Sequence, residues 1–388
     1  MIICEKEQCT GCFACVNICP QKCITMTEME FGCIHPKVDD DACINCGLCI
    51  KVCPNNNKIP KHAARHVYAS WSKDDTDRVA STSGGAATVF SKKMIQDGGV
   101  VFGAAIDEHC NIVHKAADTI ESCEGFRGSK YVQSHIEYSY TNAKKKLKED
   151  IPVLFIGTPC QIAGLLSYLQ KPYDNLITCD LICHGTPPQK LLREHMKHVL
   201  KKENLGGLRF TFRSTLGFGM SFKVYEKNKK IYDKPFYNDL YYLGFEKALF
   251  CRDSCYQCKY ASKERISDIT IGDFWGLGKE EAFDYDVKRG VSLIIPNTDK
   301  GQAFVNSCED KLELFERTID EAAKGNSQLN HPSKAHIKRN EFIKSYNKLG
   351  FNKAASKALL KDRFKYPILY MIFKFPFLKK IILKIRRK

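Results

Sequence analysis

The spacing of apolar and polar positions changes along the chain and divides it into two parts. From about residue 67 onward, apolar runs and amphipathic stretches alternate, which predicts alternating strands and helices in an α/β core. Before this region, residues 24–41 predict a short hairpin. Residues 55–66, with three consecutive asparagines, predict a linker. We therefore expect a small unit followed by a larger one.

The larger unit holds apolar runs that are bounded by turn residues. They predict buried strands over residues 100–106, 153–157, 176–183 and 268–274. Helices are predicted over residues 86–95, 139–149, 187–202 and 239–250, and a pair of β-hairpins over residues 208–233 around Gly217-Phe218-Gly219. Thr158 and Pro159 supply a helix cap and a first-turn proline, so Cys160 is predicted at a helix N-terminus.

The smaller unit contains one cysteine pattern twice. The run Cys9–Pro20 recurs as Cys43–Pro54, and every cysteine shifts by the same 34 positions. The spacing C-x2-C-x2-C-x3-C-P is typical of two-cluster ferredoxins, in which the fourth cysteine of each run binds the other cluster. The pattern therefore assigns one 4Fe-4S cluster to Cys9, Cys12, Cys15 and Cys53, and a second to Cys43, Cys46, Cys49 and Cys19.

Zinc is the alternative for cysteine-rich runs, but structural zinc sites normally use two separated C-x2-C pairs. Three further cysteines, Cys4, Cys23 and Cys33, lie outside the repeated pattern, and we interpret them as packing residues near the clusters. The chain has 388 residues and 20 cysteines, many of them in tight runs, which indicates metal binding in a reducing compartment. With no apolar run long enough for a signal peptide or a spanning helix, we expect a cytoplasmic protein.

Charge extends this picture. The formal net charge is +16, which favours an acidic redox protein or an anionic redox coenzyme as partner, although the charge of an ordinary basic protein is the alternative. No nucleic-acid-binding motif accompanies the charge. Residues 366–388 interleave bulky apolar residues with cations only. This tail predicts either an interfacial helix on an anionic membrane surface or a terminal helix docked on its own domain.

Seven short motifs in the larger unit carry a family resemblance. They are Ser81–Gly85, Gly98–Ala104, Arg127–Ser134, Gly157–Gln161, Cys183–Gly185, Cys255–Tyr260 and Ser267–Gly276. Together they make residues from about 78 to 310 resemble the beta subunit family of coenzyme F-420 hydrogenases and dehydrogenases. With the two-cluster unit in front, the chain looks like a fused form of that family.

The resemblance implies a flavoprotein that binds FAD, with an additional iron-sulfur cluster in many members. Some members exchange hydride with the deazaflavin coenzyme F-420, and others reduce different substrates, including chlorophyll-type tetrapyrroles. The fold therefore transfers more safely than the substrate. No nucleophile–base arrangement stands out, so no catalytic residue is assigned.

A third cluster has a candidate ligand set in Cys160, Cys183, Cys255 and Cys258. Two of these follow predicted strands and two form a C-x2-C loop, and loops at the carboxyl ends of parallel strands meet at one crevice. The resemblance agrees with this set. Cys179 and Cys251 are close alternates, and buried inert cysteines are the alternative interpretation.

For the flavin, Ser83-Gly84-Gly85 before a helix offers backbone amides and a positive helix end to a pyrophosphate, or forms a simple helix cap. Arg127 and Lys130 lie in a glycine-containing loop and are candidates for pairing with phosphate; a solvated loop is the alternative. Gly272 and Asp273 are candidates to line the flavin or the cluster, or to form a turn after a strand.

The sequence thus predicts an α+β two-cluster ferredoxin domain (residues 1–62) followed by a mixed α/β flavin-binding module (residues 67–150 and 151–350) and a basic apolar tail (residues 351–388). The predicted function is that of an iron-sulfur flavoprotein oxidoreductase. It would pass electrons between a low-potential carrier, ferredoxin or coenzyme F-420, and a substrate or partner. A non-catalytic electron-transfer subunit and a redox sensor are the alternatives.

Overall fold

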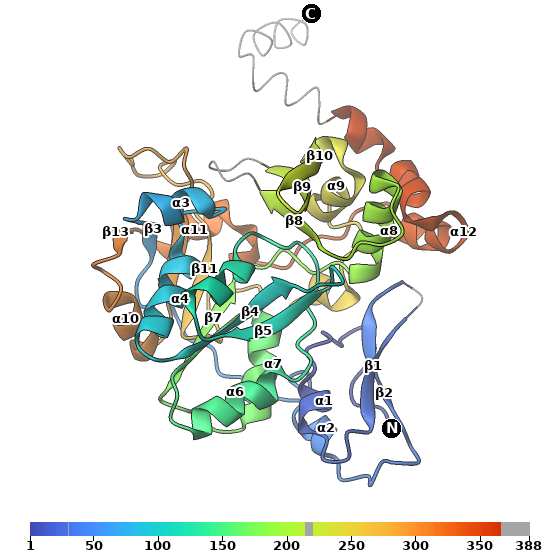
Figure 1. The fold of residues 1–388 in the computed structure, drawn as a ribbon, viewed down its shortest axis with the longest axis horizontal. Helices are drawn as coiled ribbons and strands as arrows, with labels where there is room; N and C mark the ends of the chain where they lie inside the picture. Colours follow the sequence, from blue (N-terminus) through green and yellow to red (C-terminus); the bar gives the residue numbers. More distant parts are fainter. Residues whose placement is uncertain (30, 214–219, 366–388) are drawn as a thin grey trace, which may run out of the picture.

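The computed structural model describes residues 1–29, 31–213 and 220–365. Its strands in these residues form sheets of two, eight and three strands (Figure 1). The strands are β1 (Ile24–Glu28), β2 (Ile34–Val38), β3 (Tyr68–Ser72), β4 (Val100–Ile106), β5 (Ile112–Ala117), β6 (Val153–Gly157), β7 (Leu176–Leu181), β8 (Leu208–Arg213), β9 (Met220–Glu226), β10 (Lys229–Pro235), β11 (Ile269–Asp273), β12 (Ser292–Pro296) and β13 (Leu312–Glu316).

The helices are α1 (Ala14–Ile18), α2 (Leu48–Lys51), α3 (Asp75–Ala80), α4 (Ala86–Gln96), α5 (Ile120–Cys123), α6 (Ser139–Lys148), α7 (Pro159–Leu169), α8 (Gln189–Leu200), α9 (Leu240–Glu246), α10 (Asp299–Asn306), α11 (Ile319–Gly325) and α12 (Arg339–Ala358). Strands and helices lie at the predicted places. The predicted strand over residues 176–183 ends two residues earlier, at Leu181, and the helix over residues 239–250 ends at Glu246.

The eight-stranded sheet is mixed, with the order β13-β3-β12-β11-β7-β6-β4-β5. Its centre, β4-β6-β7-β11, is parallel, and the other pairs are antiparallel. Alternate residues of each strand face opposite sides. In β4, Val100 and Phe102 join the core that includes residues of α6 and α7, whereas Val101 joins the core that includes residues of α4. Helices therefore cover both faces of the sheet, as expected for strands that are apolar throughout.

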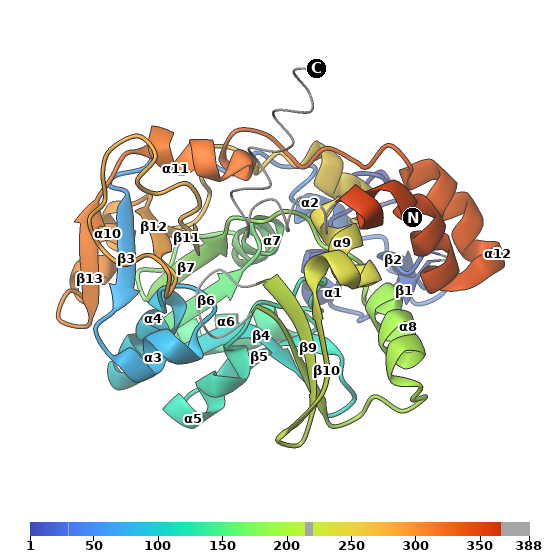
Figure 2. The same ribbon diagram turned by 90° about the horizontal axis from the view of Figure 1, so that it is seen from above.

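A second core lies beside this sheet. The sheet β10-β9-β8 lies beside α8, α9 and α12 (Figures 1 and 2). Together these elements enclose a cluster of buried aromatic side chains. At its centre the ring nitrogens of His195 lie 2.8 Å from Asp239 Oδ2 and 2.8 Å from Asn352 Oδ1. The Asp239 carboxylate overcomes the effect of burial and raises the pKa of His195, so the two residues form a buried ion pair.

The N-terminal unit is the predicted hairpin, β1 paired with β2, flanked by the two cysteine runs. In each run the residues on either side of the second cysteine have positive φ: Gly11 (63°) and Phe13 (66°) in the first, Asn45 (54°) and Gly47 (71°) in the second. The sequence repeat is therefore also a backbone repeat. The first run ends in α1, which packs on α7 of the larger unit (Figure 1).

Part of the predicted tail belongs to the larger unit. The predicted boundary at residue 351 falls inside α12, where Phe351, Ala354 and Ala355 are buried in the core of α8 and α9. The interfacial-helix prediction for residues 366–388, and the turn predicted at Gly217–Gly219, lie outside the described residues. None of the helices in the described residues is long and apolar enough to cross a membrane.

Candidate functional site

The eight cysteines of the repeated runs gather in two groups. Cys9, Cys12, Cys15 and Cys53 line one small cavity, together with Cys4. A second small cavity is lined by Cys19, Cys43, Cys46 and Cys49, together with Cys23. In both, the fourth cysteine of one run stands with the first three of the other, which is the crosswise grouping that the spacing predicts.

The chemistry of these groups fits iron-sulfur clusters. Burial raises the pKa of the Cys12 thiol to about 12, so a thiolate there needs a positive charge beside it, and iron supplies one. Among the described residues no three His, Cys, Asp or Glu side chains converge on a point where a single metal ion would bind. In a cubic 4Fe-4S cluster each thiolate binds a different iron atom, so the four cysteine ligands need not converge on a single point.

The first run is held against the larger unit by two buried side chains. Arg252 donates to the carbonyl oxygens of Cys9 (3.0 Å) and Ile34 (2.9 Å), and Gln133 donates to those of Thr10 (3.1 Å) and Gly11 (3.3 Å). Arg252 Nη1 also donates to Gln133 Oε1, at 3.1 Å. These bonds fix the loop that carries Cys9 and Cys12 on the surface of the α/β module.

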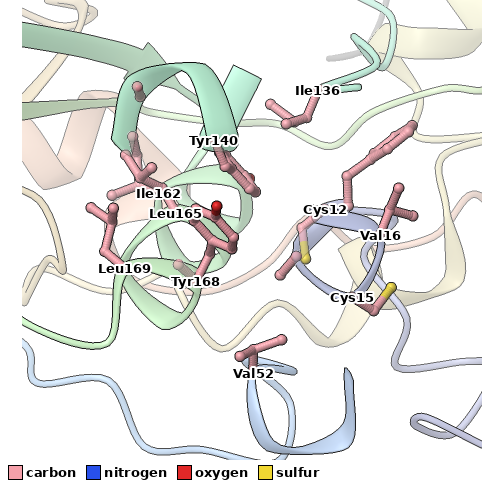
Figure 3. Packing of buried hydrophobic residues seen from close by; sticks show 14 of the residues in the cluster. Cys12, Cys15, Val16, Val52, Ile136, Tyr140, Ile162, Leu165, Tyr168 and Leu169 are labelled. Carbon is pink, nitrogen blue, oxygen red and sulfur yellow. The ribbon is translucent and has the colours of Figure 1, made fainter. Parts of the chain in front are cut away.

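Helix α7 brings the first cysteine group close to a third. Cys160 is the second residue of α7, and Gly164 lies one turn later on the same helix. A Cβ atom on Gly164 would lie 2.7 Å from the Tyr140 hydroxyl oxygen and 3.1 Å from Cys12 Sγ, so the lack of a side chain there lets Cys12 approach α7 closely. Figure 3 shows Cys12, just before α1, beside the side chains of α6 and α7, among them Tyr140 and Leu165.

The third group consists of the four cysteines predicted from the sequence. Cys160 opens α7, Cys183 follows β7, and Cys255 and Cys258 come from one short loop. The four interact electrostatically with one another, and each interaction raises a thiol pKa. The backbone amides of Gly185 and Thr186 point at Cys183 Sγ and Cys255 Sγ, both at 3.4 Å. Amide donors of this kind stabilise sulfur that carries negative charge.

The two alternative ligands for the third cluster, Cys179 and Cys251, have different surroundings. Cys179 is fully buried in the core of β7, β11 and α4, and the groups that shift its pKa are carboxylates rather than other thiols. Cys251 is also fully buried, but it neighbours Cys255 and Cys33. Cys33, interpreted as a packing residue of the first unit, therefore lies on the side of that unit that faces the third group.

A buried ion pair fixes the third group. Arg265 donates to the Asp180 carboxylate (3.0 Å) and to the Leu181 carbonyl (3.2 Å), two residues before Cys183. It also donates to the Tyr260 carbonyl (2.8 Å), two residues after Cys258. One guanidinium thus ties together the two segments that supply the predicted ligands. Its planar fork of donors suits this multiple bonding.

A large cavity of about 610 Å³ lies next to the third group. Gly157, Thr158, Ile182 and His184, which flank Cys160 and Cys183 in the chain, line one part of its wall. Another part is lined by residues that carry hydroxyl groups, among them Ser81, Thr82, Thr88, Ser91 and Ser129. The volume is that of a site for a cofactor or small ligand, which typically occupies about 300–1,000 Å³.

Comparisons with known proteins match two parts of the chain. Residues 151–322 match the family model for the C terminus of the coenzyme F420 hydrogenase/dehydrogenase beta subunit, and residues 8–57 match that of a 4Fe-4S dicluster domain. The first of these matches spans somewhat less than half of the chain. The chain is thus an iron-sulfur redox protein that is related to the coenzyme F420 hydrogenase beta subunit and carries a 4Fe-4S dicluster domain before the related region.

Individual relatives are distant. The chain is 24% identical over 236 residues to the coenzyme F420 hydrogenase subunit beta of Methanococcus voltae, covering 58% of this chain and 74% of that protein. A chain in a structure of the F420-reducing [NiFe] hydrogenase complex from Methanosarcina barkeri is 18% identical, with a TM-score of 0.47, covering 76% of this chain and 91% of that one.

The structure brings together most of the residues predicted to bind a cofactor. Ser83, Gly85, Arg127, Lys130, Gly272 and Asp273 all line the large cavity. Gly84 does not line it, because its backbone packs against β3 and β12: a Cβ there would lie 2.2 Å from the Ser70 carbonyl oxygen. Close backbone packing therefore explains this glycine.

The two predicted cations differ. Lys130 is bound to its own loop, where Nζ donates to the carbonyls of Phe126, Arg127 and Gly128, and burial lowers its pKa to about 8. Arg127 pairs with two carboxylates, Asp77 at 2.8 Å and Glu124 at 2.6 Å, but its Nη1 atom is buried and has no hydrogen-bond partner among the described residues. Arg127 therefore keeps a donor for an anion, whereas Lys130 shapes the loop.

Sequence reasoning missed one wall of the cavity. Arg213 reaches Asp273 Oδ2 at 2.5 Å and lies over the Trp275 ring, 5.3 Å from its centroid. Glu246 also lines this wall, and burial, opposed by Arg213, raises its pKa to about 7. Arg213 ends a strand and Glu246 ends a helix, and neither belongs to a motif. Arg213 and Glu246 come together because β8 and α9 pack against the sheet.

Proposed function

We propose that the chain is an iron-sulfur flavoprotein oxidoreductase. In this proposal the two groups of the dicluster domain and the third cysteine group each hold a 4Fe-4S cluster, and the large cavity holds FAD. The main support for the proposal is that the first cysteine group, α7, the third cysteine group and the cavity lie next to one another. The first group touches α7 at Gly164, α7 carries Cys160, and the residues beside Cys160 and Cys183 line the cavity.

The cavity fits a flavin by several features. It has room for one, a wall rich in hydroxyl groups, and the unpaired Nη1 donor of Arg127 for a phosphate oxygen. A flavin also needs its reacting ring close to a cluster, and His184 and Thr158 line the wall beside the third group. FAD, when bound, exchanges electrons singly with a cluster and in pairs with a substrate.

The chain's own residues would then have distinct tasks. Arg265 holds the ligand segments in place, and Arg127 and the Ser83–Gly85 turn bind and orient the cofactor. Glu246, with a pKa of about 7, is suited to hold or release a proton at its carboxylate. An anionic coenzyme such as coenzyme F-420 would be attracted to this module, because the chain's excess positive charge lies outside the dicluster domain.

Replacing one predicted ligand of the third cluster tests the proposal. In Cys160→Ser, purified without oxygen, the iron content should fall by about four per chain while the flavin remains bound. Reductant supplied to the dicluster domain should then no longer bleach the flavin rapidly. Cys179→Ser is the matched control, since that cysteine lies in the sheet core. Unchanged iron and unchanged flavin reduction in Cys160→Ser would contradict the proposal.

The substrate is tested separately. Reduced coenzyme F-420 mixed with the oxidised protein should bleach the flavin if this coenzyme is the partner, and the absence of any change would remove it. A protein with clusters but no flavin would instead be an electron-transfer subunit of a larger assembly, or a redox sensor.

A further inference from the structure

The two cysteine runs have the same sequence pattern and backbone, yet within the part of the chain that the structure describes only the first is covered by the larger unit. In the first run all of Cys9, Cys12, Cys15 and the partner Cys53 are buried. In the second group Cys46 is exposed, and Cys43 and Cys19 are partly exposed. Because the positions correspond one to one, the covered run shows how a protein surface binds this fold.

The contacts of the first run are made with its backbone. Gln133 donates to the carbonyls of Thr10 and Gly11, and Arg252 donates to that of Cys9. The corresponding positions of the second run are Ile44, Asn45 and Cys43, and the side chain of Ile44 is 59% exposed. A protein surface that met the second run in the same way would place Arg, Lys or Gln side chains against these carbonyls.

The remaining positions differ in the same direction. Phe13 is buried at 7% exposure, whereas a Cβ on its counterpart Gly47 would meet nothing within 4 Å among the described residues. Val16 is buried at 9% exposure, and its counterpart Ile50 is 39% exposed. The exposed residues Met1 and Ile2 add further apolar surface at the same end of the domain, where Met1 lines the second cavity. The second group therefore carries an uncovered apolar patch.

Charge around this patch is opposite to that of the whole chain. Residues 1–57, which end where the match to the dicluster domain ends, contain seven acidic and four basic residues and have a net charge of −3 within a chain of +16. Lys58 and Lys61 bring the predicted domain of residues 1–62 to a net charge of −1. Three of the acidic residues, Asp39, Asp40 and Asp41, are exposed between Val38 and Cys43, both of which line the second cavity. The rim of the patch is thus acidic on this side.

We propose that the surface formed by Ile44, Ile50, Asp39, Asp40 and Asp41 around Cys46 docks a one-electron redox protein whose contact face is basic and rich in hydrogen-bond donors. The proposal rests on the electron-transfer function proposed above. It places the outside partner at the second cluster and leaves the buried first cluster to connect with the third through α7. Donor side chains would bind the exposed backbone carbonyls, and lysines or arginines would pair with the aspartates.

The test uses a basic cytochrome c as one-electron acceptor. The full chain, reduced and freed of reductant without oxygen, is mixed with the cytochrome at several salt concentrations. A chain of net charge +16 would repel this protein, and the rate constant would rise with salt. We expect the reverse, a rate constant that falls as salt rises. In Asp40→Lys/Asp41→Lys we expect a loss of about tenfold at low salt.

Two matched controls locate the effect. Glu309→Lys/Asp310→Lys makes the same charge change on the far module, and Ile337→Gln matches Ile44→Gln at another exposed isoleucine. Each control should stay within about twofold of the wild type, while Ile44→Gln should be slower. Zero-length coupling of carboxylates to cytochrome lysines should join Asp39, Asp40 or Asp41.

A rate constant that rises with salt, or one that the Asp40→Lys/Asp41→Lys and control variants lower equally, would overturn the docking surface. Normal iron content and normal cluster reduction in that case would leave the proposed function standing. A chain without clusters would overturn both.

Discussion

The dicluster domain and the α/β module are stabilised in different ways. The domain is small and acidic, and its interior is built largely from cysteines that surround two cluster cavities. The module carries the remaining charge of +19 and buries several ion pairs in continuous apolar cores, among them His195–Asp239 and Arg265–Asp180. The stability of the domain should therefore depend on metal, and that of the module on packing and buried charge.

Removing the metal should produce the largest difference in stability between the dicluster domain and the α/β module. Chelation of the oxidised clusters should unfold residues 1–57, because mainly the hairpin, the Arg252 and Gln133 hydrogen bonds and the packing of α1 on α7 would then hold these described residues. Hydrogen exchange should show loss of protection there, with β4, β6 and β7 still protected. Equal loss in both regions would contradict the separation.

Breaking the His195–Asp239 pair should destabilise the α/β module and leave the dicluster domain unchanged. Asp239→Asn leaves a charged or unpaired histidine in the core and should lower the free energy of unfolding of the module by about 3 kcal/mol. Iron bound to the dicluster domain should be unchanged, as checked by visible absorbance during thermal unfolding.

The same pair sets a pH dependence. The raised pKa of His195 means that its contribution is complete below its unfolded pKa of about 6.5 and is lost as pH rises through the folded value. The lowered pKa of Asp239 means that its contribution is lost as pH falls through that value. The wild-type module should therefore lose stability above about pH 6.5. If the melting temperature of Asp239→Asn fell with pH as steeply as that of the wild type, this assignment would be contradicted.

Gly11 and Gly47, which flank the second cysteine of their runs on opposite sides, give a smaller comparison at two positions of positive φ. Gly11→Ala and Gly47→Ala both place alanine at positive φ, at a cost of about 1–2 kcal/mol. In Gly11→Ala the new Cβ also displaces Gln133 and Arg252, which should add roughly 1–3 kcal/mol for their buried hydrogen bonds. Calorimetry should show the larger loss for Gly11→Ala, and equal losses would mean that the interface does not hold the loop.

The smallest effect is expected on the open surface. Ile44→Gln and Ile337→Gln should each change the free energy of unfolding by less than about 0.5 kcal/mol, since both side chains are largely exposed. A thermal unfolding series checks this. A large destabilisation by Ile44→Gln would show that the patch supports the fold.

Spacing made the dicluster domain predictable, because ligand geometry fixes the distances between cysteines along the chain. The α/β order was predictable from apolar runs, and the capped helix at Thr158 correctly placed Cys160. Arg213, Glu246 and Arg252 were not found, since each acts through partners distant in sequence: Arg252 contacts Cys9, and Arg213 contacts Asp273. Gly84 matched a family motif, but its environment shows packing rather than cavity lining. The cavity could not be predicted, because its walls come from elements whose order in space was not known from the sequence.

The most direct test of the central claim is the cofactor content of the protein purified without oxygen. Iron, sulfide and flavin are quantified per chain beside a visible spectrum. We expect about twelve irons and about one FAD, for three clusters and a filled cavity. About eight irons and no flavin would contradict it, and the third cysteine group and the cavity would then have no part in electron transfer.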